Sequence, residues 1–164
     1  MLQAAIVGLG WWGGTLVEAM QNSPNMRFTA AFTRSRSEKD QELAAKYGLK
    51  LFDNFEAMVA DPSINAVVLA SPPIAHHEQI LIAAKHGKHV FIEKPPAVTT
   101  FQTRALAAHA EQNHCLTMVG FNRRYIPVMQ RVKEMQREAG NLNMAVSVFY
   151  KNQPDALYYD GGID

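Results

Sequence analysis

Short apolar runs alternate with segments of helical spacing along most of this 164-residue chain. Six runs have the length and composition of buried strands, at residues 2–8, 27–33, 49–52, 65–70, 88–93 and 115–120. Helices are predicted between and after them, at residues 12–22, 37–47, 53–61, 75–86, 100–113 and 125–139. Strands that alternate with helices in this way form a parallel sheet covered on both faces, with right-handed crossovers. The sequence therefore predicts an α/β, doubly wound parallel sheet with strand order 3-2-1-4-5-6.

A seventh β-rich run, residues 144–150, follows the last predicted helix and is expected to lie outside the six-stranded sheet. An apolar strand without a sheet to join is an aggregation liability. This run therefore indicates a second domain. The predicted organisation is a domain over residues 1–121, followed at residues 122–164 by the beginning of another.

The bulk composition excludes several classes of protein. Sixteen basic and fifteen acidic residues give a formal charge of +1, which predicts neither a nucleic-acid partner nor an anionic membrane surface. Cys115 is the single cysteine, so an internal disulfide is excluded and a reducing compartment is favoured. No apolar run reaches the ~18 residues of a spanning helix, and the first residues do not resemble a signal peptide. We expect a cytoplasmic protein.

Three glycines, Gly8, Gly10 and Gly13, have the G-x-G-x-x-G spacing directly after the first strand and at the start of a helix. This context is typical of the Rossmann dinucleotide-binding turn. Gly8 would allow the tight turn, Gly10 the approach of a pyrophosphate, and Gly13 close packing of the helix on the strand. Trp11 and Trp12 lie between them and are candidates to stack on a cofactor or substrate. The alternative is a glycine-rich turn that binds no ligand.

The residues after the second strand bear on which dinucleotide binds. An NAD enzyme is expected to have an acidic residue about 20 positions past the glycines, to bond the ribose 2′-hydroxyl. That position is Thr33, followed by Arg34, Ser35 and Arg36, with no acid before Glu38. Hydroxyls and guanidinium groups suit a 2′-phosphate, so NADP is predicted in preference to NAD. A solvated basic loop is the alternative.

Polar residues follow the other strands at the same edge, because all carboxyl ends of parallel strands meet there. The residues assigned to the cofactor cleft from these segments are Ser71, Pro72, Pro73, His76, Glu93, Lys94, Asn122 and Arg123. His76 and His77 are adjacent on one helix and diverge by roughly 100°, so they cannot grip one metal together. No metal site is predicted.

Three segments, "VGLGWWG", "ASPPIAHHEQILIAAKHGKHVFIEKPPAVT" and "VGFNRRYIP", resemble the Gfo/Idh/MocA family, which includes glucose–fructose oxidoreductase and inositol dehydrogenase. The resemblance implies a Rossmann domain followed by the start of an α+β domain for substrate binding and dimerisation. It implies hydride transfer between NAD(P) and a hydroxyl carbon of a sugar, cyclitol or related small molecule, in a homo-oligomer. In that family an E-K-P segment closes on the nicotinamide and substrate, and Glu93 and Lys94 match it.

Oxidation of an alcohol removes a hydride from carbon and a proton from oxygen, and the protein must manage the proton and the charge on oxygen. Lys94 suits the role of a polarising cation or relay member, because the neighbouring Glu93 favours its charged form. The alternative is that this pair is only a solvated strand end.

The family's Asp and His, in a D-x-G-x-H stretch, would follow a glycine-rich turn, and the sequence reaches Asp164 without that His. The expectation is that these residues are the N-terminal part of a dehydrogenase and do not turn over alone. The alternative is a non-catalytic NAD(P)-binding sensor or partner-binding module.

Overall fold

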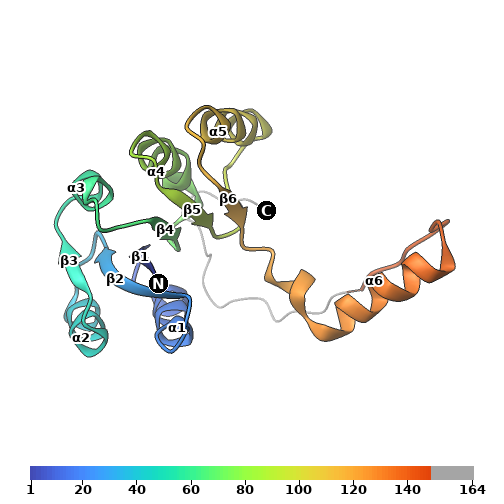
Figure 1. The fold of residues 1–164 in the computed structure, drawn as a ribbon, viewed down its shortest axis with the longest axis horizontal. Coiled ribbons are helices and arrows are strands. Elements are labelled where there is room, and N and C mark those ends of the chain that lie inside the picture. Colours follow the sequence, from blue (N-terminus) through green and yellow to red (C-terminus); the bar gives the residue numbers. More distant parts are fainter. Residues whose placement is uncertain (149–164) are drawn as a thin grey trace. The chain divides into compact units, whose positions relative to one another are not determined.

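The computed structural model describes residues 1–148, and the chain divides into two compact units, Met1–Gly120 and Phe121–Asp164 (Figure 1). The strands of the first unit are β1 (Leu2–Val7), β2 (Met26–Phe32), β3 (Lys50–Phe52), β4 (Ala66–Leu69), β5 (His89–Ile92) and β6 (Thr117–Val119). Its helices are α1 (Trp11–Met20), α2 (Glu38–Tyr47), α3 (Phe55–Ala60), α4 (Pro73–Lys85) and α5 (Thr100–Gln112). All strand pairs are parallel, in the order β3-β2-β1-β4-β5-β6, which confirms the predicted topology.

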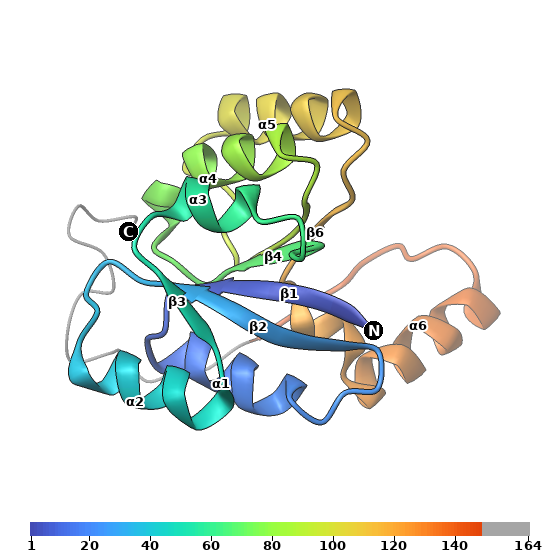
Figure 2. The same ribbon diagram turned by 60° about the vertical axis from the view of Figure 1, so that its left-hand side comes forward.

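Two layers of helices cover the sheet, with α1 and α2 on one face and α3, α4 and α5 on the other (Figure 2). The pleat of β1 divides its side chains between these layers. Ala4 and Ile6 pack in the core beneath α1 and α2, whereas Ala5 and Val7 pack in the core beneath α3 to α5. All four are essentially inaccessible to solvent. Burial on both faces explains why β1 reads as a continuous apolar run.

Local capping signals determine where several helices begin and end. Ser37 caps α2 and Thr99 caps α5, each in a reciprocal capping box with the residue three positions later. The Asn54 side chain accepts a hydrogen bond from the backbone N–H of Ala57 at the start of α3. Gly48 ends α2 with φ of 65°, a left-handed conformation that favours glycine.

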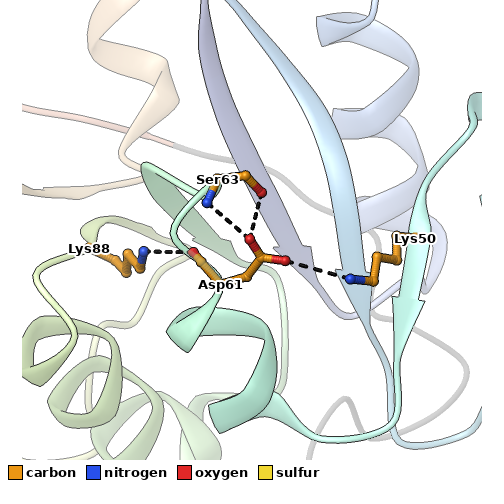
Figure 3. A network of polar contacts seen from close by, with 4 residues as sticks. All are labelled: Lys50, Asp61, Ser63 and Lys88. Atoms are coloured by element: carbon orange, nitrogen blue, oxygen red, sulfur yellow. Dashed lines mark hydrogen bonds and ion pairs between the residues drawn. The ribbon is translucent and has the colours of Figure 1, made fainter.

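The buried side chain of Lys88 links two connections at the amino ends of the strands, at the opposite edge of the sheet from the glycine turn. The Nζ of Lys88 donates to the carbonyl oxygen of Asp61 at 2.9 Å (Figure 3). It also donates to the carbonyl oxygen of Ile64 at 2.7 Å. The Asp61 carboxylate accepts hydrogen bonds from Ser63 and lies 3.6 Å from Nζ of Lys50. The bonds from Ser63 hold the pKa of Asp61 below its ordinary value. This network ties the start of β5 to the connection between α3 and β4.

The second unit differs from the prediction of one helix over residues 125–139. It contains a 3-10 turn, η1 (Asn122–Tyr125), and a separate helix, α6 (Pro127–Ala139). Pro127 occupies the first helical position, where its missing N–H costs nothing. Ile126 is extended, with ψ of 134°, because a residue before proline avoids the helical region. Proline likewise starts α4 at Pro73, two residues before its predicted start.

The prediction of a seventh strand over residues 144–150 was wrong for the part that the structure describes. Residues 144–148 form no strand, and the last two predicted positions lie outside the described residues. A strand forms only where another strand supplies partners for its backbone groups, so apolar composition alone was insufficient. Over residues 1–148, no helix is long and apolar enough to cross a membrane.

Candidate cofactor site

The glycine turn lies where the strand order reverses, between β1 and β4. Gly8 follows β1 with φ of 89°, and a Cβ atom there would lie 2.8 Å from the carbonyl oxygen of Ala70, which follows β4. Only glycine combines this backbone conformation with so close an approach. In doubly wound folds, ligands bind outside the carboxyl ends of the strands at this reversal point.

The two other glycines of the motif have different surroundings. A Cβ atom on Gly13 would overlap the carbonyl oxygen of Gly8, so this position must lack a side chain for α1 to pack against the turn. A Cβ atom on Gly10 would meet no atom of residues 1–148 within 4 Å. Gly10 is also the N-cap of α1, and no side chain in the described part of the chain caps the first N–H groups of that helix. The open space in front of these donors fits a pyrophosphate.

A groove of about 540 Å³ extends from the glycine turn to the start of α2. Its lining residues are Leu9, Gly10, Trp11, Gly14, Ser35, Ser37, Lys39, Asp40 and Leu43. The groove lies beside the residues after β2, where the ribose next to the adenine binds in this fold class. The sequence-based site included Gly10, Trp11 and Ser35 from this set but none of the others.

Asp40 is a buried groove residue that the sequence analysis did not predict. Its Oδ2 accepts hydrogen bonds from the Ser35 hydroxyl at 2.5 Å and the Ser37 N–H at 2.9 Å. The Thr33 hydroxyl continues this chain, 3.2 Å from that of Ser35. Burial alone would raise the pKa of Asp40, but the bonds from Ser35 and Ser37 outweigh burial and hold that pKa below its ordinary value. The S-x-x-D capping-box pattern was the signal that could have revealed it.

The two arginines after β2 have different environments. Arg36 forms an ion pair with Asp53, which follows β3, so part of its charge is compensated within the protein. Arg34 is exposed. Together with Lys39 in the groove, Arg34 supplies positive charge near the end of β2.

Glu93 is held between the ends of neighbouring strands. Its N–H donates to the carbonyl oxygen of Leu69 at 2.9 Å. A Cβ atom on Gly120, directly after β6, would lie 2.9 Å from Oε1 of Glu93, so the glycine makes room for this carboxylate. Lys94 is exposed, and its backbone N–H donates to Oε2 of Glu93 at 3.3 Å. The pair therefore lies at the same edge of the sheet as the glycine turn.

His76 is fully buried beneath this edge. Its Nδ1 lies 2.9 Å from the carbonyl oxygen of Pro95, and its Nε2 lies 2.8 Å from that of Ser71. The prolines predicted beside it, Pro72 and Pro73, are the N-cap and first residue of α4. Both ring nitrogens of His76 therefore face backbone carbonyl oxygens, and the cofactor-binding role assigned to this residue stays a prediction.

The two tryptophans of the turn are placed differently. Trp11 is 76% exposed and lines the groove, whereas Trp12 is half-buried, with ring centroids 5.6 Å apart. Within the described part of the chain, the buried Nε1 of Trp12 has no hydrogen-bond partner. Asn122 and Arg123 belong to η1 in the second unit, and their contribution to the cleft stays a prediction.

A six-stranded parallel sheet, with a glycine turn and an uncapped helix N-terminus at its reversal point, defines the dinucleotide-binding Rossmann class. Residues 2–121 match the model of the Gfo/Idh/MocA oxidoreductase family, which is described by an NAD-binding Rossmann fold. The chain belongs to this family.

Individual relatives agree with this assignment. The chain is 29% identical over 160 residues to the scyllo-inositol 2-dehydrogenase (NADP(+)) IolU of Bacillus subtilis, covering 96% of this chain and 48% of the relative. Among solved structures, an NAD-binding protein from Listeria innocua has a TM-score of 0.76 at 32% identity, covering 84% of this chain and 40% of that one. The scyllo-inositol dehydrogenase from Lactobacillus casei, solved with NAD(H) and scyllo-inositol, has a TM-score of 0.79 at 25% identity and coverages of 85% and 42%.

The chain spans about half the length of these relatives or less. They include proteins named for NADP(+) and for NAD(H), so the comparisons support a nicotinamide dinucleotide without selecting one.

Proposed function

We propose that this chain is the cofactor-binding part of a longer NAD(P)-dependent dehydrogenase. Its reaction would transfer a hydride between the nicotinamide and a hydroxyl carbon of a sugar, cyclitol or related small molecule. The observation that carries the proposal is the glycine cradle at the reversal point, with Glu93 and Lys94 at a neighbouring strand end. Relatives named as inositol dehydrogenases support the substrate class. We place the enzyme in the cytoplasm as a homo-oligomer.

A bound nicotinamide would supply the hydride chemistry. Lys94 would donate a hydrogen bond from its ammonium group to the substrate oxygen and stabilise the negative charge that develops there. The Glu93 carboxylate accepts a hydrogen bond from the Lys94 N–H, so its negative charge would lie beside the ammonium group of Lys94. The exposed position of Lys94 leaves it accessible to a substrate.

NADP is proposed as the preferred cofactor. Support comes from Arg34, which is exposed after β2, and from Lys39, which lines the groove. The hydroxyl of Ser35 is already bound to Asp40 and Arg36 is paired with Asp53, so the preference depends mainly on the first two side chains. A guanidinium group binds a 2′-phosphate with charge-assisted hydrogen bonds that a 2′-hydroxyl cannot match.

Fluorescence titration of the chain with NADPH and NADH tests this proposal. We expect NADPH to bind more tightly, and Arg34→Ala to weaken NADPH about 10- to 100-fold while leaving NADH unchanged. Arg27→Ala is the matched control, because this exposed arginine lies near the amino end of β2. Equal or tighter binding of NADH would reject the preference, and binding of neither cofactor would reject the dinucleotide site.

A further inference from the structure

One imidazole spans the two loops that follow β4 and β5, at the edge of the sheet that carries the glycine turn. His76 lies in the first turns of α4, with its side chain fully buried. Its Nε2 faces the carbonyl oxygen of Ser71, in the loop after β4, and its Nδ1 faces that of Pro95, in the loop after β5. The second of these loops also carries Lys94.

The two loops depend on this contact to different degrees. The Ser71 loop has other anchors, including the bond from the Ser71 hydroxyl to Oε1 of Gln79 at 2.5 Å. In residues 94–97, two positions are prolines without an N–H, and the backbone N–H of Lys94 bonds to its neighbour Glu93. Among the described residues, the bond between Pro95 and His76 is the one hydrogen bond that links residues 94–97 to another element.

The protonation chemistry of imidazole makes the two bonds unequal. Carbonyl oxygens only accept hydrogen bonds, and a neutral imidazole has one N–H donor, so it can satisfy only one of them. Burial lowers the pKa of His76 and favours this neutral form, although both carbonyl contacts and the charge of Glu93 act in the opposite direction. The neutral form therefore donates a hydrogen bond to either Ser71 or Pro95, but not to both at once.

We propose that His76 is a positioning residue whose Nδ1–H donates to the Pro95 carbonyl and thereby holds Lys94 at the cleft. We assign the proton to Nδ1 because a bond to Pro95 gains more for the fold: among the described residues, residues 94–97 have no other hydrogen bond to a neighbouring element, whereas the Ser71 loop is also held by the bond to Gln79. The inference rests on the proposed function only for the role given to Lys94. The positioning itself is a property of the chain without any ligand.

Nitrogen NMR of the ¹⁵N-histidine-labelled 164-residue chain at pH 7.5, without cofactor, tests the tautomer directly. We expect a proton on Nδ1 of His76. A neutral ring protonated on Nε2 would overturn the proposal. This measurement needs no substitution at a buried position.

Hydrogen exchange over residues 93–98 tests the positioning with a matched pair of variants. Asn and Gln place a donor near the positions of Nδ1 and Nε2, so His76→Asn can keep the Pro95 bond and His76→Gln the Ser71 bond. We expect exchange in this segment to be about tenfold faster in His76→Gln than in His76→Asn, the order for one lost hydrogen bond. Equal exchange in the two variants, at matched global stability, would overturn the proposal.

A parallel titration of the unsubstituted chain with NADPH and NADH separates this proposal from the proposed function. Binding of neither cofactor would reject the dinucleotide site but leave the exchange result as the measure of positioning. Binding of a cofactor together with equal exchange in the two variants would reject the positioning role alone.

Discussion

Alanine substitutions at Gly10 and Gly13 should separate ligand binding from folding. A Cβ atom on Gly13 would overlap the backbone oxygen of Gly8, which cannot rotate away as a side chain could. We expect Gly13→Ala to destabilise the chain by about 1–3 kcal/mol, the range for overpacking. Gly10 has φ of −61° and ψ of −176° with open space around its Cα, so Gly10→Ala should leave stability unchanged or raise it by up to about 1 kcal/mol.

Gly10→Ala, which should not destabilise the fold, should nevertheless weaken binding of the cofactor. A methyl group on Gly10 would occupy the space in front of the first N–H groups of α1, where we place the pyrophosphate. Loss of one charge-assisted hydrogen bond costs about 1.5–3 kcal/mol, so we expect NADPH binding to weaken about 10- to 100-fold. Urea unfolding gives the free energy of unfolding, and fluorescence titration of the same samples gives the dissociation constant.

Two results would refute this reasoning. If Gly10→Ala binds NADPH as tightly as the unsubstituted chain, the pyrophosphate does not lie in front of Gly10. If Gly13→Ala is as stable as the unsubstituted chain, the overlap with Gly8 is relieved by the backbone at no cost. The two variants serve as each other's controls, because they add the same methyl group three residues apart.

Three further predictions concern charged residues. In the full-length enzyme, Lys94→Ala should lower kcat by about 10²–10⁴-fold with little change in cofactor affinity. The control variant Lys85→Ala, at the far end of α4, should leave kcat unchanged. A kcat of Lys94→Ala within about threefold of wild type would favour a solvated strand end or a non-catalytic module. Asp40 has a lowered pKa in the folded state, so its ionised form stabilises the fold above the unfolded-state pKa, and this stabilisation is lost as the pH falls through the folded-state value. Urea unfolding across pH should therefore show an Asp40→Asn deficit that is greatest near neutral pH and vanishes in acid; a deficit independent of pH would contradict the assignment. Lys88→Met should cost about 2–3 kcal/mol in urea unfolding, because it leaves the buried carbonyl oxygen of Ile64 and the half-buried one of Asp61 without their donor. Lys50→Met removes the exposed partner of the same network and should cost clearly less, so equal losses would argue against the bonds of Lys88.

Much of the fold was determined by sequence patterns whose physical basis is local. Alternating strands and helices, with right-handed crossovers, were sufficient to predict the strand order that the sheet adopts. Ser37, Asn54, Thr99 and Gly48 mark helix ends because capping involves residues a few positions apart. The glycine turn could be predicted for the same reason, since Gly8 and Gly13 contact each other within one turn of chain.

Features that depend on distant partners required the tertiary structure. The run at residues 144–148 is apolar, yet composition could not show whether a neighbouring strand exists for it. Sequence reasoning placed His76 near the cleft but could not show that its ring joins Ser71 to Pro95, which lies 19 residues beyond His76. Gly120 makes room for Glu93 only because β5 and β6 are neighbours in the sheet. The sequence determined which local structures form, whereas packing of the strands and helices decided which side chains meet, because those contacts join segments that no short-range pattern connects.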